Sequence, residues 1–173
     1  ENGDVYYQAA ALNPHDRQVF VSHKNGKVER LTDQEGWNSA IFSGDYQFFI
    51  NTWSNYNTPY TFTLRSQKGK VLSVLLDNSK LKDKMAEYGW SKREPFTFTT
   101  SEGISLDGWM LKPNNFDPSH KYPVILFQYS GPGSQQVVDS WKAGSLGNGG
   151  AFDQYLVQQG FIVVCVDGRG TGG

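Results

Sequence analysis

The segment Tyr129–Ser134 (YSGPGS) is the part of the sequence best suited to chemistry. It follows the apolar run Val124–Phe127, which is typical of a buried strand. The glycines and the proline after the tyrosine permit a sharp turn. A phenol at a strand end is a neutral hydrogen-bond donor, and its ring fixes the direction in which it points. We therefore predict that Tyr129 directs its hydroxyl into a functional site.

A second candidate group follows the apolar run Phe161–Val166, where the sequence reads Asp167–Thr171 (DGRGT). The two apolar runs flank a segment with helical spacing, so a βαβ unit with parallel strands is expected. Ligands of open α/β sheets bind at the carboxyl ends of their strands, and Asp167 and Arg169 occupy one such end. A structural ion pair is the expected role of Arg169.

The sequence offers no nucleophile in the right context. Ser145, in the relaxed A-x-S-x-G pattern of residues 143–147, lacks the strand before it and the helix after it that an elbow requires. The histidines His15, His23 and His120 do not follow a serine and an acid in the order of α/β-hydrolases, and we expect them at the surface. Neither metal-ligand spacing nor a phosphate or dinucleotide fingerprint occurs, so no metal and no cofactor is expected.

Short strands separated by tight turns are predicted over residues 4–76. Runs rich in β-branched and aromatic residues mark them: Val5–Tyr7, Gln18–Val21, Val28–Leu31, Ser39–Phe42, Gln47–Ile50, Tyr60–Leu64 and Val71–Leu75. Asn25-Gly26 is typical of a two-residue hairpin turn. The four strands between Trp37 and Leu75 have the length of one propeller blade. Fewer than two blades cannot bury their own faces, so we expect an internal part of a longer protein.

Residues 77–173 have a different pattern. Asp77–Ser79 is expected to cap a short helix over Lys80–Met85 in a linker of residues 77–93. An alternating pair follows over Phe96–Thr99 and Ser105–Leu111. The buried parallel strands then enclose a helix over Ala151–Gln159, with Phe152, Tyr155 and Leu156 on one face and Gly160 at its end.

The composition excludes several classes of protein. The formal net charge is −1 and the longest basic run is Lys92-Arg93, which argues against nucleic acid or an anionic membrane as an obligatory partner. No apolar stretch approaches the roughly 20 residues of a spanning helix. The first residues are polar and lack a signal-peptide pattern, so any targeting segment was removed or lies upstream. The single cysteine, Cys165, is expected to be a buried core residue.

Lys121–Gln135 (KYPVILFQYSGPGSQ) and Val166–Gly172 (VDGRGTG), behind the strand-rich half, resemble the prolyl oligopeptidase family of serine peptidases. The Gly-Pro-x-Ser-Gln form after the tyrosine, in place of Tyr-Gly-Gly, is similar to the dipeptidyl peptidase IV branch. Trp53-Ser54 and Asn57–Pro59 extend the resemblance into the first half, so it covers nearly the whole chain.

The resemblance implies a fold class in which β-propeller blades precede an α/β-hydrolase domain. Residues 1–76 would be the last blades, 77–93 the linker, and 94–173 the N-terminal part of the catalytic domain, truncated before the nucleophile elbow. Tyr129 would donate to the oxyanion, while Gly131, Asp167 and Arg169 would belong to the supporting loops. The catalytic Ser, Asp and His would lie outside this chain, so the 173 residues alone are predicted to be inactive.

The resemblance also implies a function. The intact protein would be a serine exopeptidase that releases N-terminal Xaa-Pro or Xaa-Ala dipeptides through an acyl-enzyme, from peptides with a free N-terminus. A homodimer and a periplasmic, secreted or membrane-anchored location are family expectations. Two alternatives stay open: a sister activity (prolyl oligopeptidase, acylaminoacyl peptidase or prolyl tripeptidyl peptidase), and a non-catalytic propeller module that only binds. A pair of glutamates upstream would favour the first reading over its sisters.

Overall fold

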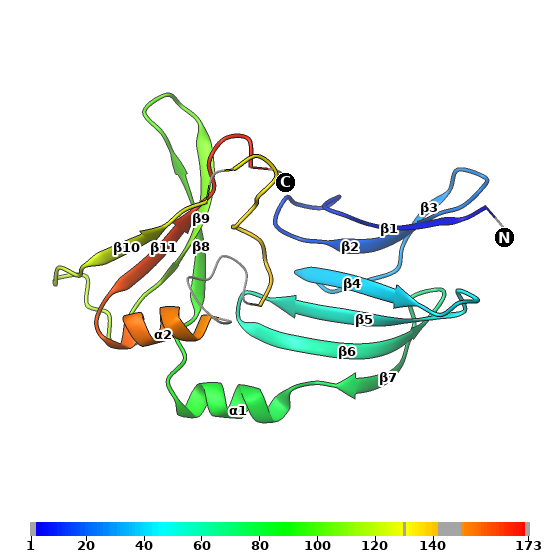
Figure 1. The fold of residues 1–173 in the computed structure, drawn as a ribbon, viewed down its shortest axis with the longest axis horizontal. Coiled ribbons are helices and arrows are strands. Elements are labelled where there is room, and N and C mark those ends of the chain that lie inside the picture. The colour runs from blue at the N-terminus through cyan, green and yellow to red at the C-terminus, as the bar shows by residue number, and fades with distance from the viewer. Residues whose placement is uncertain (1–2, 130, 142–149, 172–173) are drawn as a thin grey trace. The chain divides into compact units, whose positions relative to one another are not determined.

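The computed structural model describes residues 3–129, 131–141 and 150–171. The chain forms two compact units (Figure 1). The first comprises Glu1–Lys82 with Asp139–Trp141, and the second comprises Asp83–Val138 with Lys142–Gly173. The division lies inside the segment predicted as a linker.

The first unit is built from antiparallel strands, as the alternating sequence predicts. They are β1 (Val5–Ala9), β2 (Gln18–Ser22), β3 (Val28–Arg30), β4 (Trp37–Phe42), β5 (Phe48–Asn55), β6 (Thr58–Ser66) and β7 (Val71–Leu76). Among the described residues, β1–β3 form one sheet in sequence order and β4–β7 form another (Figure 1). Gly26 has φ 85° in the predicted hairpin turn between β2 and β3. The predicted group of four strands from Trp37 onward is therefore confirmed as one sheet.

An apolar core holds these two sheets together. Val19, Val21, Leu31 and Phe49 are buried in it, with Tyr6, Ala40 and Phe42 packed against them. Burial of such side chains contributes about 1.5–3 kcal/mol each relative to exposure.

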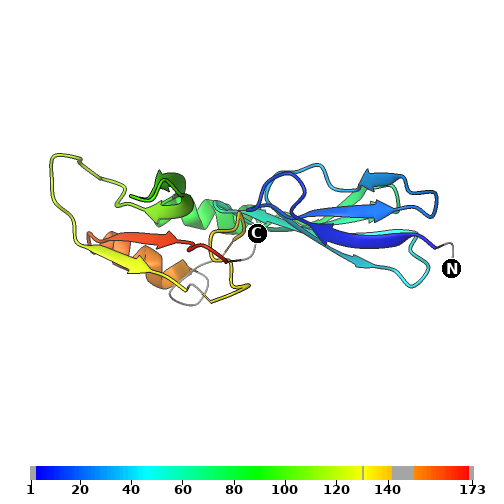
Figure 2. The ribbon, with the colours of Figure 1, turned by 90° about the horizontal axis from the view of Figure 1, so that it is seen from above.

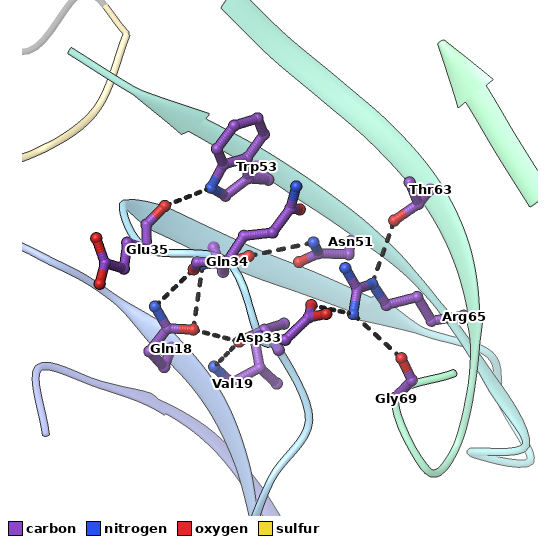
Figure 3. A network of polar contacts seen from close by, with 12 residues as sticks. Gln18, Val19, Asp33, Gln34, Glu35, Asn51, Trp53, Thr63, Arg65 and Gly69 are labelled. Carbon is purple, nitrogen blue, oxygen red and sulfur yellow. Dashed lines mark hydrogen bonds and ion pairs between the residues drawn. The ribbon is translucent and has the colours of Figure 1, made fainter. Parts of the chain in front are cut away.

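A buried polar network lies beside this core (Figure 3). The Gln18 amide oxygen accepts hydrogen bonds from Thr32 Oγ1 at 2.7 Å and Asn38 Nδ2 at 3.3 Å, and Asn51 Nδ2 donates to Asn38 Oδ1 at 3.2 Å. The buried Arg65 donates to Asp33 at 3.0 Å. Sequence patterning did not predict this network, because amides and hydroxyls on strands are typical of a solvated face. Buried polar groups need such partners, so the network specifies how β2, β4 and β5 meet.

Residues 139–141 belong to the first unit although they follow the Tyr129 segment in the chain. Asp139 N donates to His15 O at 2.9 Å, and Asp139 Oδ1 accepts from Tyr56 N at 2.6 Å. Trp141 N donates to Ser54 Oγ at 3.1 Å. Burial raises the pKa of the Asp139 carboxyl, and the bond from Tyr56 N opposes this effect.

The predicted linker helix is present as α1 (Ser79–Glu87) and is longer than the sequence suggested. Asp77 Oδ1 accepts from Ser79 N at 3.0 Å, and Asn78 O accepts from Leu81 N and Lys82 N. None of the described residues of α1 is buried, which agrees with its charged composition.

The second unit contains a mixed sheet with a covering helix. Its elements are β8 (Arg93–Thr99), β9 (Ser105–Leu111), β10 (Val124–Phe127), α2 (Ala151–Gln158) and β11 (Ile162–Val166). Within the described residues the strand order is β10-β11-β9-β8. The pair β10–β11 is parallel (Figure 2), and β8–β9 is antiparallel. In the parallel pair, Phe127 lies opposite Cys165. Both pairings were predicted from the sequence.

The face of α2 that carries Phe152 and Tyr155 is not its buried face. Phe152 and Tyr155 are exposed and stack with ring centroids 6.4 Å apart, whereas Asp153, Gln154 and Val157 are buried. The buried positions are occupied by polar groups because each has a partner. Asp153 pairs with Arg93 at 3.3 Å, and Gln154 exchanges two hydrogen bonds with the Ser91 backbone, at 2.8 and 2.9 Å.

The predicted end of α2 is confirmed. Gly160 has φ 89°, its N–H donates to Val157 O, and Phe161 N donates to Leu156 O. This pair of bonds is the Schellman arrangement, in which a glycine takes the left-handed conformation that other residues avoid.

The parallel strands are less buried than predicted. Val124 and Leu126 share one face of β10 and are 59% and 60% exposed. No described element covers this face of β10, whereas Val163 and Cys165 of the neighbouring β11 are fully buried. The described residues contain one parallel strand pair and do not form a complete α/β-hydrolase domain. The assignment of this unit to the beginning of that domain therefore stays a proposal.

Candidate functional site

Tyr129 lies two residues beyond the end of β10, in the loop that the sequence singled out. Its side chain is 60% exposed. Within the described part of the chain, its hydroxyl makes no hydrogen bond. The phenol is therefore available to a bound molecule. The oxyanion role of Tyr129 stays a prediction.

The turn after Tyr129 forms as predicted. The Gly131 carbonyl accepts hydrogen bonds from Ser134 N at 3.1 Å and Ser134 Oγ at 2.6 Å. Pro132 takes the first central position, and Gly133, with φ 74°, takes the second. Proline followed by a residue with positive φ is the pattern of a type II turn. The chain therefore reverses direction over residues 131–134.

Gly131 has a second role that the sequence did not reveal. A Cβ atom at this position would lie 3.2 Å from Cε1 of the Tyr129 ring. That spacing is tighter than an ordinary van der Waals contact, so any larger residue would push the ring. The absence of a side chain at Gly131 thus allows the Tyr129 ring to lie against the loop backbone.

Asp167 holds the far end of the same loop. It directly follows β11, and its carboxylate is buried. Gln136 N donates to both carboxylate oxygens, at 2.9 and 3.1 Å, and Val137 N donates to Oδ2 at 2.8 Å. Its own backbone N–H donates to Asp107 O of β9 at 3.1 Å. The Tyr129 loop is therefore attached to β10 at one end and to Asp167 at the other.

The Asp167 charge also acts on the strand behind it. Burial, followed by the negative charge of Asp167, raises the pKa of the Cys165 thiol to about 12. The thiol is fully buried and stays neutral at physiological pH. Cys165 is thus a core residue, as predicted, and provides no nucleophile.

Arg169 lies apart from this arrangement. Its guanidinium forms an ion pair with Glu102 in the turn between β8 and β9, and the two side chains are 57% and 68% exposed. The predicted structural ion pair is therefore present. Among the loop residues proposed as supports, the structure brings Gly131 and Asp167 to the Tyr129 loop, while Arg169 contacts the β8–β9 turn. The sequence placed Asp167 directly after an apolar run, and the structure adds its burial and its contacts with Gln136 and Val137.

The remaining candidates add no site. Ser145 lies outside the described residues. His23 pairs with Asp4 at 3.0 Å and His120 pairs with Asp117 at 2.9 Å, both at least partly exposed, while His15 is half-buried. Across the described residues, no three His, Cys, Asp or Glu side chains gather as a metal site would require. In the same residues, no helix has the length and apolarity needed to cross a bilayer.

Comparison with known proteins gives a consistent result. Residues 1–60 match the family model described as the dipeptidyl peptidase IV (DPP IV) N-terminal region. The crystal structure of Porphyromonas gingivalis dipeptidyl peptidase 4 superposes with a TM-score of 0.89 and 39% identity, over 99% of this chain and 24% of that one.

Two curated relatives agree. A Schizosaccharomyces pombe protein named as a dipeptidyl aminopeptidase is 34% identical over 98% of this chain and 21% of its own length. Dipeptidyl peptidase 4 of Arthroderma otae is 29% identical over 97% of this chain and 22% of its own length. The chain thus spans about a fifth of the curated relatives it matches. It is dipeptidyl peptidase IV-like along almost all of its length, which confirms the resemblance inferred from its motifs.

Proposed function

We propose that the chain is part of a serine exopeptidase that releases dipeptides from the N-termini of peptides, with Tyr129 as an oxyanion donor. The observation that carries the proposal is the placement of Tyr129. Its exposed hydroxyl stands at the carboxyl end of a parallel strand, in a loop held by a tight turn and by Asp167. Open α/β sheets bind their ligands at this edge. The dipeptidyl peptidase names of the relatives support the choice of reaction.

The domain assignment is part of the same proposal. Residues 1–76 would be the last blades of a β-propeller, because β4–β7 form a four-stranded antiparallel sheet in sequence order among the described residues. Residues 77–93 would be the linker. Residues 94–173 would begin the α/β-hydrolase domain, because β10, α2 and β11 form a βαβ unit.

The chemistry assigned to Tyr129 follows from charge development. When the serine nucleophile attacks the substrate carbonyl, the carbonyl oxygen becomes an oxyanion. A phenol that is already oriented donates to this oxyanion without further reorganisation, and it does so again when water attacks the acyl-enzyme. The serine, its histidine base, the orienting aspartate and the second oxyanion donor would come from outside these residues. Tyr129 would therefore stabilise charge, while other groups move the proton.

The test is the release of chromophore from a Gly-Pro anilide by the full-length protein and its Tyr129→Phe variant. Loss of one oxyanion donor lowers turnover by about 10²–10³-fold, or about 2.7–4 kcal/mol of transition-state stabilisation. We expect kcat to fall by that factor and KM to change little. Tyr155→Phe is the matched control, because Tyr155 is an exposed tyrosine on the outer face of α2. It should keep wild-type turnover.

Each other outcome assigns a different function. Cleavage of blocked or longer peptides, without cleavage of the Gly-Pro anilide, would move the protein to a sister activity of the same family. Turnover of the anilide that survives Tyr129→Phe would remove the oxyanion role. A folded full-length protein that hydrolyses no peptide would support the binding module instead.

A further inference from the structure

We propose that Asp167 is a positioning residue for Tyr129. The carboxylate would act through the loop backbone and would set where the phenol points. This inference rests on the proposed oxyanion role of Tyr129 and extends it to the group that holds the donor in place. Its basis is the set of contacts that joins the carboxyl ends of β10 and β11.

Tyr129 and Asp167 each follow one of the two parallel strands of the sheet. The parallel ladder between β10 and β11 ends with Phe127 opposite Cys165. Tyr129 and Asp167 each lie two residues beyond this last pair. Tyr129 and Asp167 thus leave neighbouring strands at the same edge, where the carboxyl ends of parallel strands meet.

The loop then returns from Tyr129 to Asp167. The turn closed by the Gly131 carbonyl and Ser134 reverses the chain, and two residues later the backbone reaches the Asp167 carboxylate. Val137, which donates the 2.8 Å bond, also buries its side chain almost completely. The segment 131–137 is therefore held by its own turn and by the Asp167 carboxylate, and Tyr129 lies between this segment and the end of β10 in the sequence.

The side chain of Asp167 is suited to holding the loop backbone in one position. A short side chain has few rotamers, and a carboxylate that accepts from successive backbone N–H groups forms charge-assisted bonds. The bond from Val137 is buried and those from Gln136 are partly buried, so water cannot replace them at no cost. Asp107 O fixes the Asp167 backbone on the opposite side, through the 3.1 Å bond to β9. Through Asp167, the loop is thereby connected to β9, an inner strand of the sheet.

A misplaced donor weakens catalysis without weakening substrate binding. A displacement of about 1 Å can lower a rate by about 10²-fold. In Asp167→Asn, one amide oxygen stays available to the loop while the amide nitrogen faces a backbone donor. We therefore expect Asp167→Asn in the full-length protein to lower kcat by about 10–10²-fold and to leave KM within about twofold.

The deciding measurement is a double-mutant cycle with Tyr129→Phe, assayed on the Gly-Pro anilide. If Asp167 acts through the phenol, Asp167→Asn costs little once the phenol is gone, and the two losses are far from additive. Equal fold losses in both backgrounds would show that Asp167 serves structure alone and would overturn the inference. So would full activity of Asp167→Asn. An inert Tyr129→Phe substitution would instead refute the oxyanion role itself, so the two failures are distinguishable.

Two further variants serve as a control and as a replacement for a variant that does not fold. Glu102→Gln makes the same carboxylate-to-amide change on the exposed partner of Arg169, and it should leave kcat unchanged. If Asp167→Asn does not fold, as judged by thermal unfolding, the cycle is run with Asp167→Glu, which keeps the charge and displaces the oxygens by one methylene. The same non-additive loss is expected from Asp167→Glu, and an additive loss overturns the inference there as well.

Discussion

In the second unit, solvent exposure distinguishes a side chain that could take part in a reaction from one that only packs. Tyr129 is exposed and its hydroxyl has no hydrogen bond among the described residues, whereas Cys165 is fully buried on the neighbouring strand. Burial and the Asp167 charge raise the pKa of the Cys165 thiol to about 12. The thiolate is the reactive form of cysteine, so this residue should be chemically silent in the folded protein.

This expectation gives a direct test. Cys165 in the native full-length protein should resist iodoacetamide at pH 8 and react rapidly once guanidinium unfolds the chain, with peptide mass spectrometry reporting the label. The raised pKa of Cys165 also makes the free energy of unfolding depend on pH. The pKa rises from an ordinary value of 9.0 to about 12 on folding, so the contribution is complete below pH 9 and is lost as the pH rises toward 12. Fast labelling of the native protein would contradict the burial.

At the scale of elements, α2 is held to the sheet by polar contacts as well as by apolar packing. The Arg93 guanidinium pairs with Asp153 and lies 4.3 Å from the centre of the Trp109 ring. Arg93 belongs to β8 and Asp153 to α2, so this buried pair joins the first strand of the unit to its helix. The exposed Phe152 and Tyr155 follow from it, because the polar residues occupy the inward face.

The buried pair should be costly to break. Asp153→Ala leaves the Arg93 charge buried without this partner, and removal of one member of a buried pair destabilises by about 3–5 kcal/mol. Denaturant unfolding of the full-length protein, followed by tryptophan fluorescence, measures the loss. Glu94→Ala is the control, because the Glu94–Lys112 pair is exposed and worth at most about 1 kcal/mol. Equal losses for the two variants would contradict the importance assigned to the pair.

At the scale of the whole molecule, the chain leaves apolar strand faces without cover. Leu126 of β10 and Val74 of β7 are each 60% exposed. Exposed apolar strand faces, such as that of β7, whose residues are all exposed, mark places where another surface packs. The relatives are about five times longer than this chain, which spans 21–22% of their length. The proposed activity is therefore a proposal for the full-length protein.

A prediction follows at this scale. The purified 173-residue chain should not hydrolyse the Gly-Pro anilide, whereas the full-length protein should, because a phenol alone has no oxyanion to stabilise. Labelling with a serine-hydrolase probe provides an independent readout, and the chain alone should stay unlabelled. Turnover that co-purifies with the chain and is blocked by such a probe would show that a nucleophile lies within it.

The sequence by itself determined the strands, the parallel pair, the turn after Tyr129 and the resemblance to dipeptidyl peptidase IV. These features depend on local patterns: alternation in β4–β7, apolar runs in β10 and β11, and the Gly131-Pro132-Gly133 turn. Only the tertiary structure decided which face of α2 is buried, how Gln18 and Asn38 are satisfied, and which acid holds the Tyr129 loop. Polar residues are buried when distant partners satisfy them, and those partners, such as Arg93 for Asp153 and Gln136 for Asp167, lie 60 and 31 positions away. Local pattern carries no information on such pairs, because folding alone brings them together.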